Sequence, residues 1–187
     1  MTTNPFLLKE RYREQWKRSN ARERFVKLFL DVYLPQGFRA ELTGLGAGSS
    51  EYIDRTYSGV FEAFDIVIFY EGSPAVFLDV TGVASPREAL PGLGYCLGTW
   101  KLAKAEKFKV TPMSWAAFVL EDEPSILWAP YQKFKSIQAV DGRLYNDERP
   151  VRCLKRSRWL RWARFKTWLI RYGPVYARLL REGVTGY

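Results

Sequence analysis

The chain has 187 residues, 47% of them hydrophobic and 16% aromatic, which supplies enough apolar side chains for one domain with a buried core and excludes a disordered or fibrous protein. Histidine is absent, which excludes Ser-His and Cys-His catalytic relays, histidine-ligated metal sites and Cys₂His₂ zinc sites. The formal net charge of +9 belongs to the C-terminal segment, because residues 151–187 carry ten Lys or Arg and one acid, whereas residues 1–150 carry 19 of each sign.

The first predicted element is a long helix. Asn4 followed by Pro5 is typical of an N-cap and a first helical residue, and Pro35 and Gly37 end the helix near Leu34. Apolar residues recur in it at helical spacing, so we expect one face of the helix to be buried in the core. The residues predicted on that face are Phe25, Leu28, Phe29 and Val32.

A short strand is predicted over residues 38–43, and a glycine-rich segment, residues 44–50, follows it. This segment lacks the Gly-Lys-Ser/Thr ending of a phosphate-binding P-loop, and no Rossmann strand order comes after it. We interpret it as a flexible loop that becomes ordered on binding. Ser49 and Ser50 are its candidate contacts to nucleic acid.

Two long apolar runs, residues 63–70 and 75–81, predict a hairpin of two largely buried strands. Each run contains one carboxylate, Asp65 in the first and Asp79 in the second. A carboxylate in a buried strand is costly unless a cation pairs with it. If the numbers of paired residues sum to 144 or 146, both side chains lie on one face, whereas an odd sum separates them.

Two carboxylates brought that close repel each other unless a hard cation such as Mg²⁺ lies between them. The hairpin is therefore a candidate metal site. The alternative is a pair of aspartates at strand edges that cap backbone groups or form salt bridges.

The remaining elements are less marked, and they are predicted in chain order as follows: a helix start at residues 85–88, a helix over 94–108, strands over 113–121 and 126–128, a turn at Asp141-Gly142, and helix from Pro150 that breaks at Gly173-Pro174 before a short final helix. This succession of helices and strands predicts an α/β fold in which helices pack on a mixed sheet.

The two cysteines, Cys96 and Cys153, lack CxxC spacing, so a metal site built on them is not expected, and a count of two excludes the disulfide framework of small secreted proteins. A single bridge between them is the alternative, and it suits a hyperthermophile better than other intracellular proteins. No apolar run reaches the ~18 residues of a membrane span, and the charged N-terminus is unlike a signal peptide. We therefore expect a cytoplasmic protein.

Five segments follow one another in an order that points to a known family. They are RERF at residues 22–25, QGFR at 36–39, GAGSS at 46–50, FDIV at 64–67 and LDVT at 78–81. Over about 100 residues the chain resembles the PD-(D/E)XK nuclease superfamily, nearest to its archaeal Holliday-junction resolvase branch. The resemblance implies a restriction-endonuclease-like mixed central sheet flanked by helices, here with a basic C-terminal helical extension. An archaeal virus or plasmid is the kind of source that such a small protein suits.

The resemblance also implies a set of site residues. Asp65 and Asp79 would be metal ligands, the backbone carbonyl of Val80 would be a third, and Glu23 would bind the metal or its water. The implied metal is Mg²⁺, with Mn²⁺ as a substitute. For Glu23, capping or a salt bridge on its own helix is the alternative.

One position departs from the family pattern. Thr81 stands where the superfamily has a lysine, which supplies positive charge to the attacking water and to the developing phosphorane. That lysine can migrate to a neighbouring element, and Lys101 and Lys104 lie about one turn apart on the next predicted helix. We take Lys101 as the catalytic candidate. A solvated helix face is the alternative for both lysines, and without either lysine the fold would only bind.

The C-terminal segment interleaves arginine with tryptophan, which suits phosphate contacts or a helix on a membrane surface. The candidate contacts to nucleic acid are Arg158, Arg161, Arg164 and Lys166. The aromatic stripe expected to pack on the core or on a second subunit consists of Trp159, Trp162, Phe165 and Leu169. We expect two units: a nuclease-like core over residues 1–150 and this extension over 151–187.

The sequence leads to a Mg²⁺-dependent DNA endonuclease or junction resolvase, a homodimer that acts on structured or branched DNA. Water would attack phosphorus, and the metal would orient the water and stabilise the charge. The first alternative is a non-catalytic DNA-binding protein on a degenerate nuclease fold. The second is a protein that lies on an anionic membrane surface through its C-terminal helix.

Overall fold

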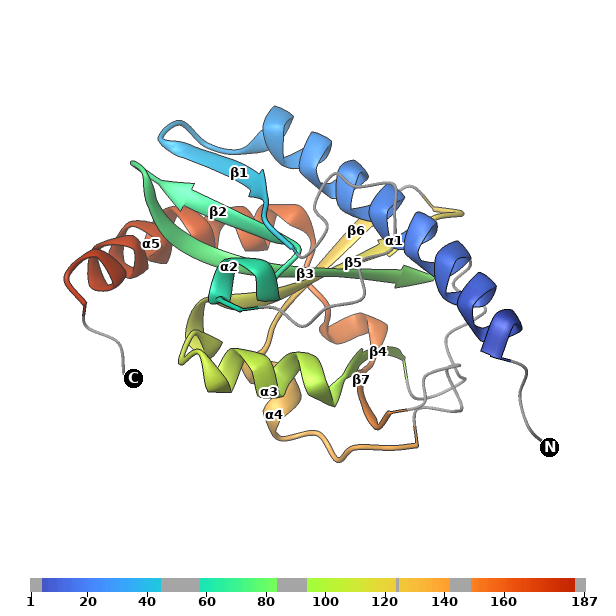
Figure 1. Ribbon diagram of the computed structural model, residues 1–187. Helices are drawn as coiled ribbons and strands as arrows, with labels where there is room; N and C mark the ends of the chain where they lie inside the picture. The colour runs from blue at the N-terminus through green and yellow to red at the C-terminus, as the bar shows by residue number, and fades with distance from the viewer. Residues whose placement is uncertain (1–4, 45–57, 84–93, 124, 142–148, 184–187) are drawn as a thin grey trace.

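A computed structural model represents the chain, and it describes the backbone of residues 5–44, 58–83, 94–123, 125–141 and 149–183 and the side chains from Trp16 onward (Figure 1). Several sequence predictions lie outside these residues. They are the N-cap Asn4, the contacts Ser49 and Ser50, the helix start at residues 85–88 and Gly142 of the predicted turn.

The centre of the molecule is a five-stranded sheet in the order β1-β2-β3-β5-β6. Its strands are β1 (Phe38–Leu42), β2 (Ile66–Tyr70), β3 (Ser73–Val83), β5 (Ser114–Leu120) and β6 (Ser125–Pro130). All neighbours pair antiparallel except β3 and β5, which pair parallel. The predicted α/β class with a mixed sheet is confirmed.

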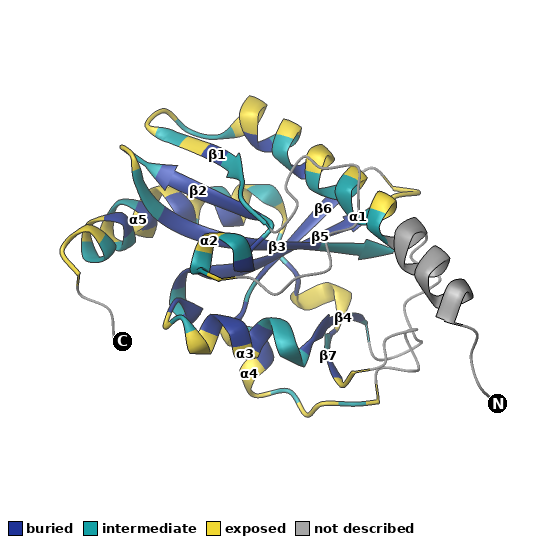
Figure 2. Ribbon diagram, viewed as in Figure 1, coloured by how far each residue is buried: buried dark blue, intermediate teal, exposed yellow. Residues whose placement is uncertain are grey.

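Helices cover both faces of this sheet, which is why its inner strands are apolar on both sides (Figure 2). One face packs against α1 (Pro5–Tyr33) and α5 (Trp162–Arg181). The other packs against α2 (Val60–Ala63), α3 (Thr99–Lys107) and α4 (Gln132–Lys135). Along β3, Leu78 and Val80 face α1 and α5, and Phe77 faces α3.

The first helix runs almost as predicted, but the predicted buried face was wrong for three of its four residues, since only Phe29 packs on the core. Leu28 and Val32 are 66% and 72% exposed, whereas Val26 and Leu30 are fully buried. Both sets have helical spacing and lie on neighbouring stripes of one helix. The orientation of α1 on the sheet, which spacing does not fix, decides which stripe is buried.

A second, two-stranded sheet replaces helix that the sequence predicted. Strand β4 (Tyr95–Gly98) precedes α3, so the helix over 94–108 begins only at Thr99. Its antiparallel partner β7 (Val151–Leu154) occupies residues predicted as helix. Each strand has four residues, too few to show a period of its own, and each is specified by a partner far away in the chain.

The same pairing joins the two cysteines. Cys96 lies opposite Cys153 in the β4–β7 ladder, with Cα atoms 3.9 Å apart, and the two form a disulfide. Of the two sequence expectations for these cysteines, the single bridge is therefore the one that the structure has.

The last helix does not break at Gly173-Pro174 as predicted. It continues to Arg181, because buried residues on both sides of the proline, Leu169 and Ala177, hold it against the sheet. A Cβ atom on Gly173 would lie 2.7 Å from Cε1 of Phe38, so the glycine permits close packing on β1. In the described part of the chain, no helix is long and apolar enough to cross a membrane.

Candidate functional site

The β2–β3 hairpin brings the two predicted carboxylates together. Ile66 pairs with Leu78, so the paired numbers at this end of the hairpin have the even sum of 144, which a bulge between Ile68 and Phe69 produces. Asp65 directly precedes β2 and lies on the same side of the hairpin as Asp79. The backbone N–H of Asp65 donates to the carbonyl of Leu78 at 3.0 Å, which anchors the start of β2. Because side chains alternate along a strand, Asp79 lies on the same face as Phe77 and therefore toward α3.

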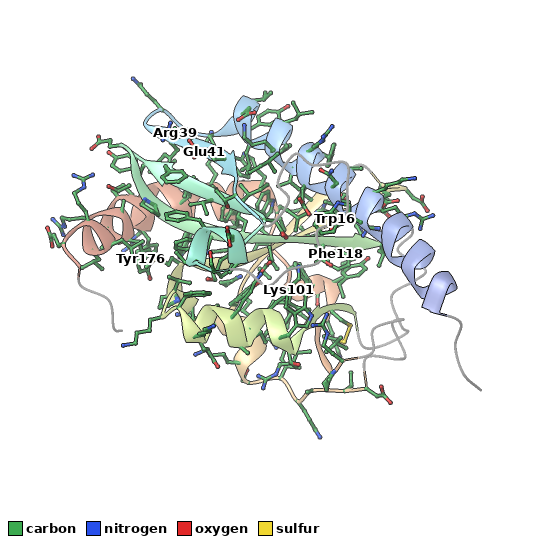
Figure 3. The ribbon with its side chains drawn as sticks, in the orientation of Figure 1. Trp16, Arg39, Glu41, Lys101, Phe118 and Tyr176 are labelled. Carbon is green, nitrogen blue, oxygen red and sulfur yellow. A yellow bond between two sulfur atoms is a disulfide. The ribbon has the colours of Figure 1, made fainter. Side chains whose placement is uncertain are left out.

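Lys101 from α3 lies within ion-pair distance of both carboxylates. Figure 3 shows it in the layer between the helix and the sheet. Its Nζ atom lies 3.5 Å from Oδ1 of Asp79 and 3.8 Å from Oδ2 of Asp65. It also donates to the backbone carbonyl of Val80 at 3.3 Å. The Lys101 ammonium group thus contacts oxygens of Asp65, Asp79 and Val80, which are the three residues predicted from the sequence as metal ligands.

A second set of contacts surrounds Asp79. Lys104 donates to Oδ1 of Asp79 and to the carbonyl of Ala63, and the hydroxyl of Tyr131 donates to Oδ2. Asp79, Lys104 and Tyr131 are all buried, and the Lys101 side chain is 14% exposed. The alternative of a solvated face for the two lysines is therefore wrong. Asp65 is more open, with a side chain that is 23% exposed and that accepts the N–H of Val80 at 2.7 Å.

The two carboxyl groups are in opposite electrostatic situations. Burial alone would raise the pKa of Asp79, but the ammonium groups of Lys101 and Lys104 and the hydrogen bonds from Lys104 and Tyr131 outweigh it and hold the pKa below its ordinary value. Burial, assisted by the charge on Asp79, raises the pKa of Asp65 above its ordinary value despite the opposing effect of Lys101. For Lys101, the acidic neighbours outweigh burial and raise the pKa.

Glu23 on α1 belongs to the same electrostatic cluster. Burial, followed by repulsion from Asp65, raises its pKa from 4.5 to about 8. It also accepts a 3.2 Å hydrogen bond from the Ser19 hydroxyl one turn earlier, so the local role on its own helix is present as well. Glu23 is thus protonated at neutral pH and releases its proton near the pH at which a general base is useful.

Sequence reasoning missed the aromatic members of the site. Tyr131 follows the last residue of β6, where nothing in the local sequence marks it, and only the fold aims its hydroxyl at Asp79. Trp100 is the other. Its ring lies 5.3 Å from Nζ of both Lys101 and Lys104 and 4.5 Å from the guanidinium of Arg149, a cation–π arrangement that steadies the cations.

The C-terminal basic residues form a separate surface. Arg158, Arg161 and Arg164 are exposed and Lys166 is half-buried. Lys166 and Arg164 belong to α5, which covers the face of the sheet opposite to α3, so the fold does not bring them to the carboxylates. The aromatic stripe of this segment packs on the core: Phe165 and Leu169 are fully buried, and Trp159 is 6% exposed.

The candidate donor set fits a hard divalent cation. Within the described residues no group of three or more His, Cys, Asp or Glu side chains could hold an ion. The set consists instead of two carboxylates and one backbone carbonyl, and their oxygens converge on the single cationic nitrogen of Lys101. Mg²⁺ binds through one or two carboxylates and keeps several waters, so three converging hard oxygens suffice for it.

No family model and no curated protein matches the sequence. Among solved structures, the chain is similar to a nuclease from a fusselovirus, with a TM-score of 0.55 and 15% identity over 83% of this chain and 94% of that chain. It also aligns with Hjc, a Holliday junction resolvase from the archaeal hyperthermophile Archaeoglobus fulgidus, with a TM-score of 0.47 and 15% identity over 80% of this chain and 96% of that chain. The chain shares its fold with the fusselovirus nuclease, and the predicted mixed sheet flanked by helices is confirmed.

Proposed function

We propose that the chain is a divalent-metal-dependent deoxyribonuclease that hydrolyses phosphodiester bonds in structured or branched DNA. One observation carries the proposal: carboxylate oxygens of Asp65 and Asp79 and the carbonyl of Val80 converge on one cationic centre. The likeness of the fold to a fusselovirus nuclease supports it. Because one fold can host several unrelated functions, the proposal depends on the residues of the site.

In this proposal Asp65, Asp79 and the Val80 carbonyl hold Mg²⁺ or Mn²⁺. A bound divalent ion supplies positive charge that lowers the pKa of a water nucleophile and stabilises the negative charge that develops at phosphorus. Lys101 supplies an ammonium donor at the site, where Thr81 has none, and can donate to a phosphate oxygen. Lys104 and Tyr131 fix the orientation of Asp79 through hydrogen bonds to both of its oxygens.

Glu23 is the proposed proton acceptor. Because its pKa is about 8, it is mostly protonated at pH 7, and the deprotonated fraction that can act as a general base increases as the pH rises through 8. Deprotonated Glu23 would take a proton from the attacking water.

We also propose that the protein works inside the cell as a homodimer, because resolution of a branched substrate requires two cuts related by symmetry. The exposed stripe of Phe25, Leu28 and Val32 on α1 supports a second subunit.

The second candidate function is DNA binding without cleavage. One observation favours it: the ammonium of Lys101 already lies within ion-pair distance of both carboxylates. A divalent ion would have to displace or share these contacts. The two functions therefore differ in whether added Mg²⁺ produces cleavage.

The deciding experiment incubates the protein with linear, nicked and four-way DNA, with Mg²⁺, with Mn²⁺ and with a chelator. We expect metal-dependent cleavage of the four-way substrate, abolished in Asp65→Asn, because asparagine keeps the shape but not the charge that holds the ion. The matched control is Asp31→Asn, which removes an exposed carboxylate paired with Lys27 on α1. Metal-independent binding of all three DNAs with no cleavage would instead support the non-catalytic function.

A further inference from the structure

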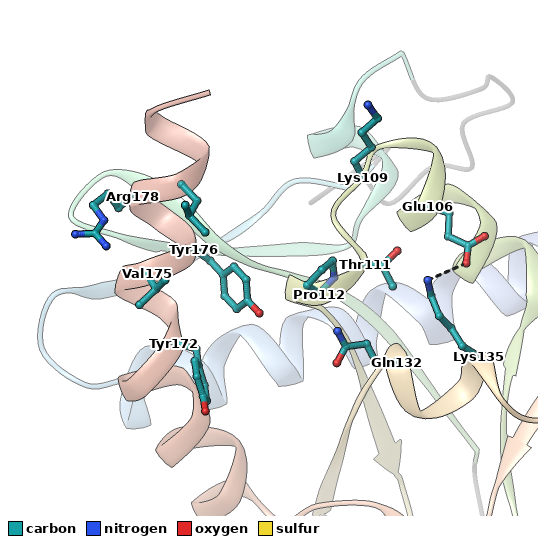
Figure 4. Close-up of a pocket in the computed structure, with 11 residues that line it drawn as sticks. Glu106, Lys109, Thr111, Pro112, Gln132, Lys135, Tyr172, Val175, Tyr176 and Arg178 are labelled. Atoms are coloured by element: carbon teal, nitrogen blue, oxygen red, sulfur yellow. Dashed lines mark ion pairs between the residues drawn. The ribbon is translucent and has the colours of Figure 1, made fainter. Parts of the chain in front are cut away.

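A groove lies away from the two carboxylates, between the C-terminal half of α5 and the wall formed by α3, α4 and η2 (Thr111–Met113) (Figure 4). Its volume is about 1010 Å³. Tyr172, Val175 and Tyr176 line it on the α5 side, and Pro112 and Gln132 line the opposite wall. The floor and walls are therefore partly apolar, with hydrogen-bonding groups among them.

The α5 wall carries a row of aromatic rings. Tyr172 and Tyr176 line the groove four residues apart on one face of the helix, and Trp168, four residues earlier, lies behind them and packs on Trp115 of the core. The ring centroids of both tyrosines lie 5.8 Å from that of Trp168. The Arg171 guanidinium lies 5.3 Å from the Tyr172 ring, and Tyr172 is 38% exposed. Exposed tyrosines next to cations are the platform on which unpaired bases stack.

Cations surround the groove. Lys109, Lys135 and Arg178 belong to its lining, against one acid, Glu106, which lies 3.3 Å from Lys135. Lys109 has a φ of 56°, in the left-handed region. It follows the end of α3, where glycine or asparagine is the usual residue. A lysine at a position that disfavours it points to a use for its side chain.

We propose that this groove binds an unpaired strand of nucleic acid. Tyr172 and Tyr176 stack bases, and Lys109, Lys135 and Arg178 contact phosphates. The inference rests on the proposed function, which it extends by a second binding site for the same substrate. The net positive lining favours a polyanion, and the aromatic row favours one with flat, stacking side groups over an acidic peptide.

The groove is within reach of a strand that occupies the candidate site. Helix α3 carries Lys101 at one end, and Lys109 follows its other end, about 12 Å away at the helical rise of 1.5 Å per residue. Helix α4, which supplies Gln132 and Lys135, begins directly after Tyr131, whose hydroxyl contacts Asp79. An unpaired strand that keeps the stacked rise of about 3.4 Å per nucleotide covers this separation with three or four nucleotides. A branched substrate offers an unpaired or splayed strand at such a distance.

The first test measures stacking. The dissociation constants of a labelled oligothymidylate and of a blunt duplex are compared in chelator, so that no cleavage occurs. Tyr172→Leu should weaken binding of the single strand about fivefold or more while leaving duplex binding unchanged, because stacking is removed and apolar bulk is kept. The control is Tyr33→Leu, which removes an exposed tyrosine on α1, outside the groove. Unchanged oligothymidylate binding in Tyr172→Leu would overturn the proposal.

The second test separates function from folding at Lys109. Lys109→Gly relieves the left-handed backbone, so thermal unfolding should move up by roughly 2 °C while oligothymidylate binding weakens. If the variant is more stable than the parent protein and still binds less tightly, misfolding cannot be the cause of the weaker binding. Lys27→Gln, which removes a lysine from α1, should leave binding unchanged. If a polyglutamate peptide rather than oligothymidylate depends on Tyr172 and Lys109, the groove is a peptide site and the proposal is wrong.

Cleavage of four-way DNA with Mg²⁺ is measured on the same variants. If the protein cleaves four-way DNA but the Tyr172 and Lys109 variants bind the single strand as tightly as the parent protein, the groove proposal is wrong and the nuclease proposal stands. Groove-dependent strand binding without cleavage would contradict the nuclease proposal and leave the groove as a nucleic-acid site.

Discussion

Asp79 and Asp65 differ in how completely the protein surrounds them. Both oxygens of Asp79 accept hydrogen bonds from buried donors, and its negative charge neutralises that of Lys104, which is 3% exposed. Asp65 is partly exposed and its pKa is raised, so the folded protein disfavours its charge. The two carboxylates that sequence reasoning treated as equivalent therefore contribute to stability with opposite sign.

Substitution to asparagine should separate them. Asp79→Asn leaves the Lys104 ammonium buried without a counter-charge, and we expect it to lower the free energy of unfolding by roughly 3 kcal/mol. Asp65→Asn should be neutral or slightly stabilising, because it removes a charge that burial disfavours. Urea denaturation of both variants checks this. Equal losses of stability would mean that Lys104 does not depend on Asp79. Asp65 is accordingly the better position for a test of catalysis.

Glu23 predicts a pH dependence of stability. Its pKa is raised from 4.5 to about 8, so between these values the folded protein binds a proton that the unfolded chain has released. This contribution to stability is fully present below the unfolded pKa and is lost as pH rises through the folded pKa. Glu23→Gln is neutral at every pH and should be more stable relative to the parent protein at pH 9 than at pH 5, in chelator. Thermal unfolding at the two pH values measures the difference, and parallel curves would contradict it.

Among the elements, the β4–β7 pair determines how the C-terminal segment is attached. It joins residues before α3 to residues before α5, and the Cys96–Cys153 bridge closes a loop with a sequence separation of 57. A loop of that length loses much conformational freedom in the unfolded state once it is cross-linked.

Removal of the bridge should therefore destabilise the protein. We expect reduction, or the double substitution Cys96→Ala with Cys153→Ala, to lower the free energy of unfolding by about 4 kcal/mol on loop-closure entropy. Guanidinium denaturation with and without dithiothreitol measures it. The alanine variant serves as the control, because reductant should not affect it further. A parent protein equally stable in both conditions would show that the bridge contributes nothing.

At the scale of the whole molecule, the net positive charge and the residues that pack on the core lie on different faces of the C-terminal segment. The net charge lies in residues 151–187, and α5 carries five basic residues and no acid. Its apolar stripe of Phe165, Leu169 and Ala177 is buried, so the basic residues remain on the surface. The polar face of this segment can therefore contact phosphates without disturbing the core.

The change of Arg158, Arg161 and Arg164 to glutamine should leave folding intact, because all three are exposed. If they bind phosphates, the slope of log K against log salt on duplex DNA should become shallower by about 0.9 for each phosphate that is no longer neutralised. Binding should weaken alike for every DNA sequence, because phosphates carry no sequence information. Arg39→Gln, on β1, is a single-charge control. The parent slope in the triple variant would exclude this surface and favour an anionic membrane or a protein partner.

Local sequence determined a large part of the architecture. Long apolar runs specified β2, β3 and β5, a helical period with a terminal proline specified α1, and the two carboxylates inside paired runs specified the candidate site. These signals are contained within a dozen residues. The register of the hairpin was not among them: the pairs beside the turn sum to 143, and only the bulge between Ile68 and Phe69 gives the even sum of 144 that brings Asp65 and Asp79 to one face.

Only the tertiary structure decided what depends on distant partners. The buried stripe of α1, the short strands β4 and β7 and the disulfide between them, the unbroken course of α5 and the hydroxyl of Tyr131 on Asp79 all involve contacts across the chain. Four residues are too few to show a period, and two stripes of one helix can have equal spacing. A single buried hydroxyl has no local signature at all. Packing against surfaces that are formed elsewhere in the sequence selects among these possibilities, and that is why local patterns left them open.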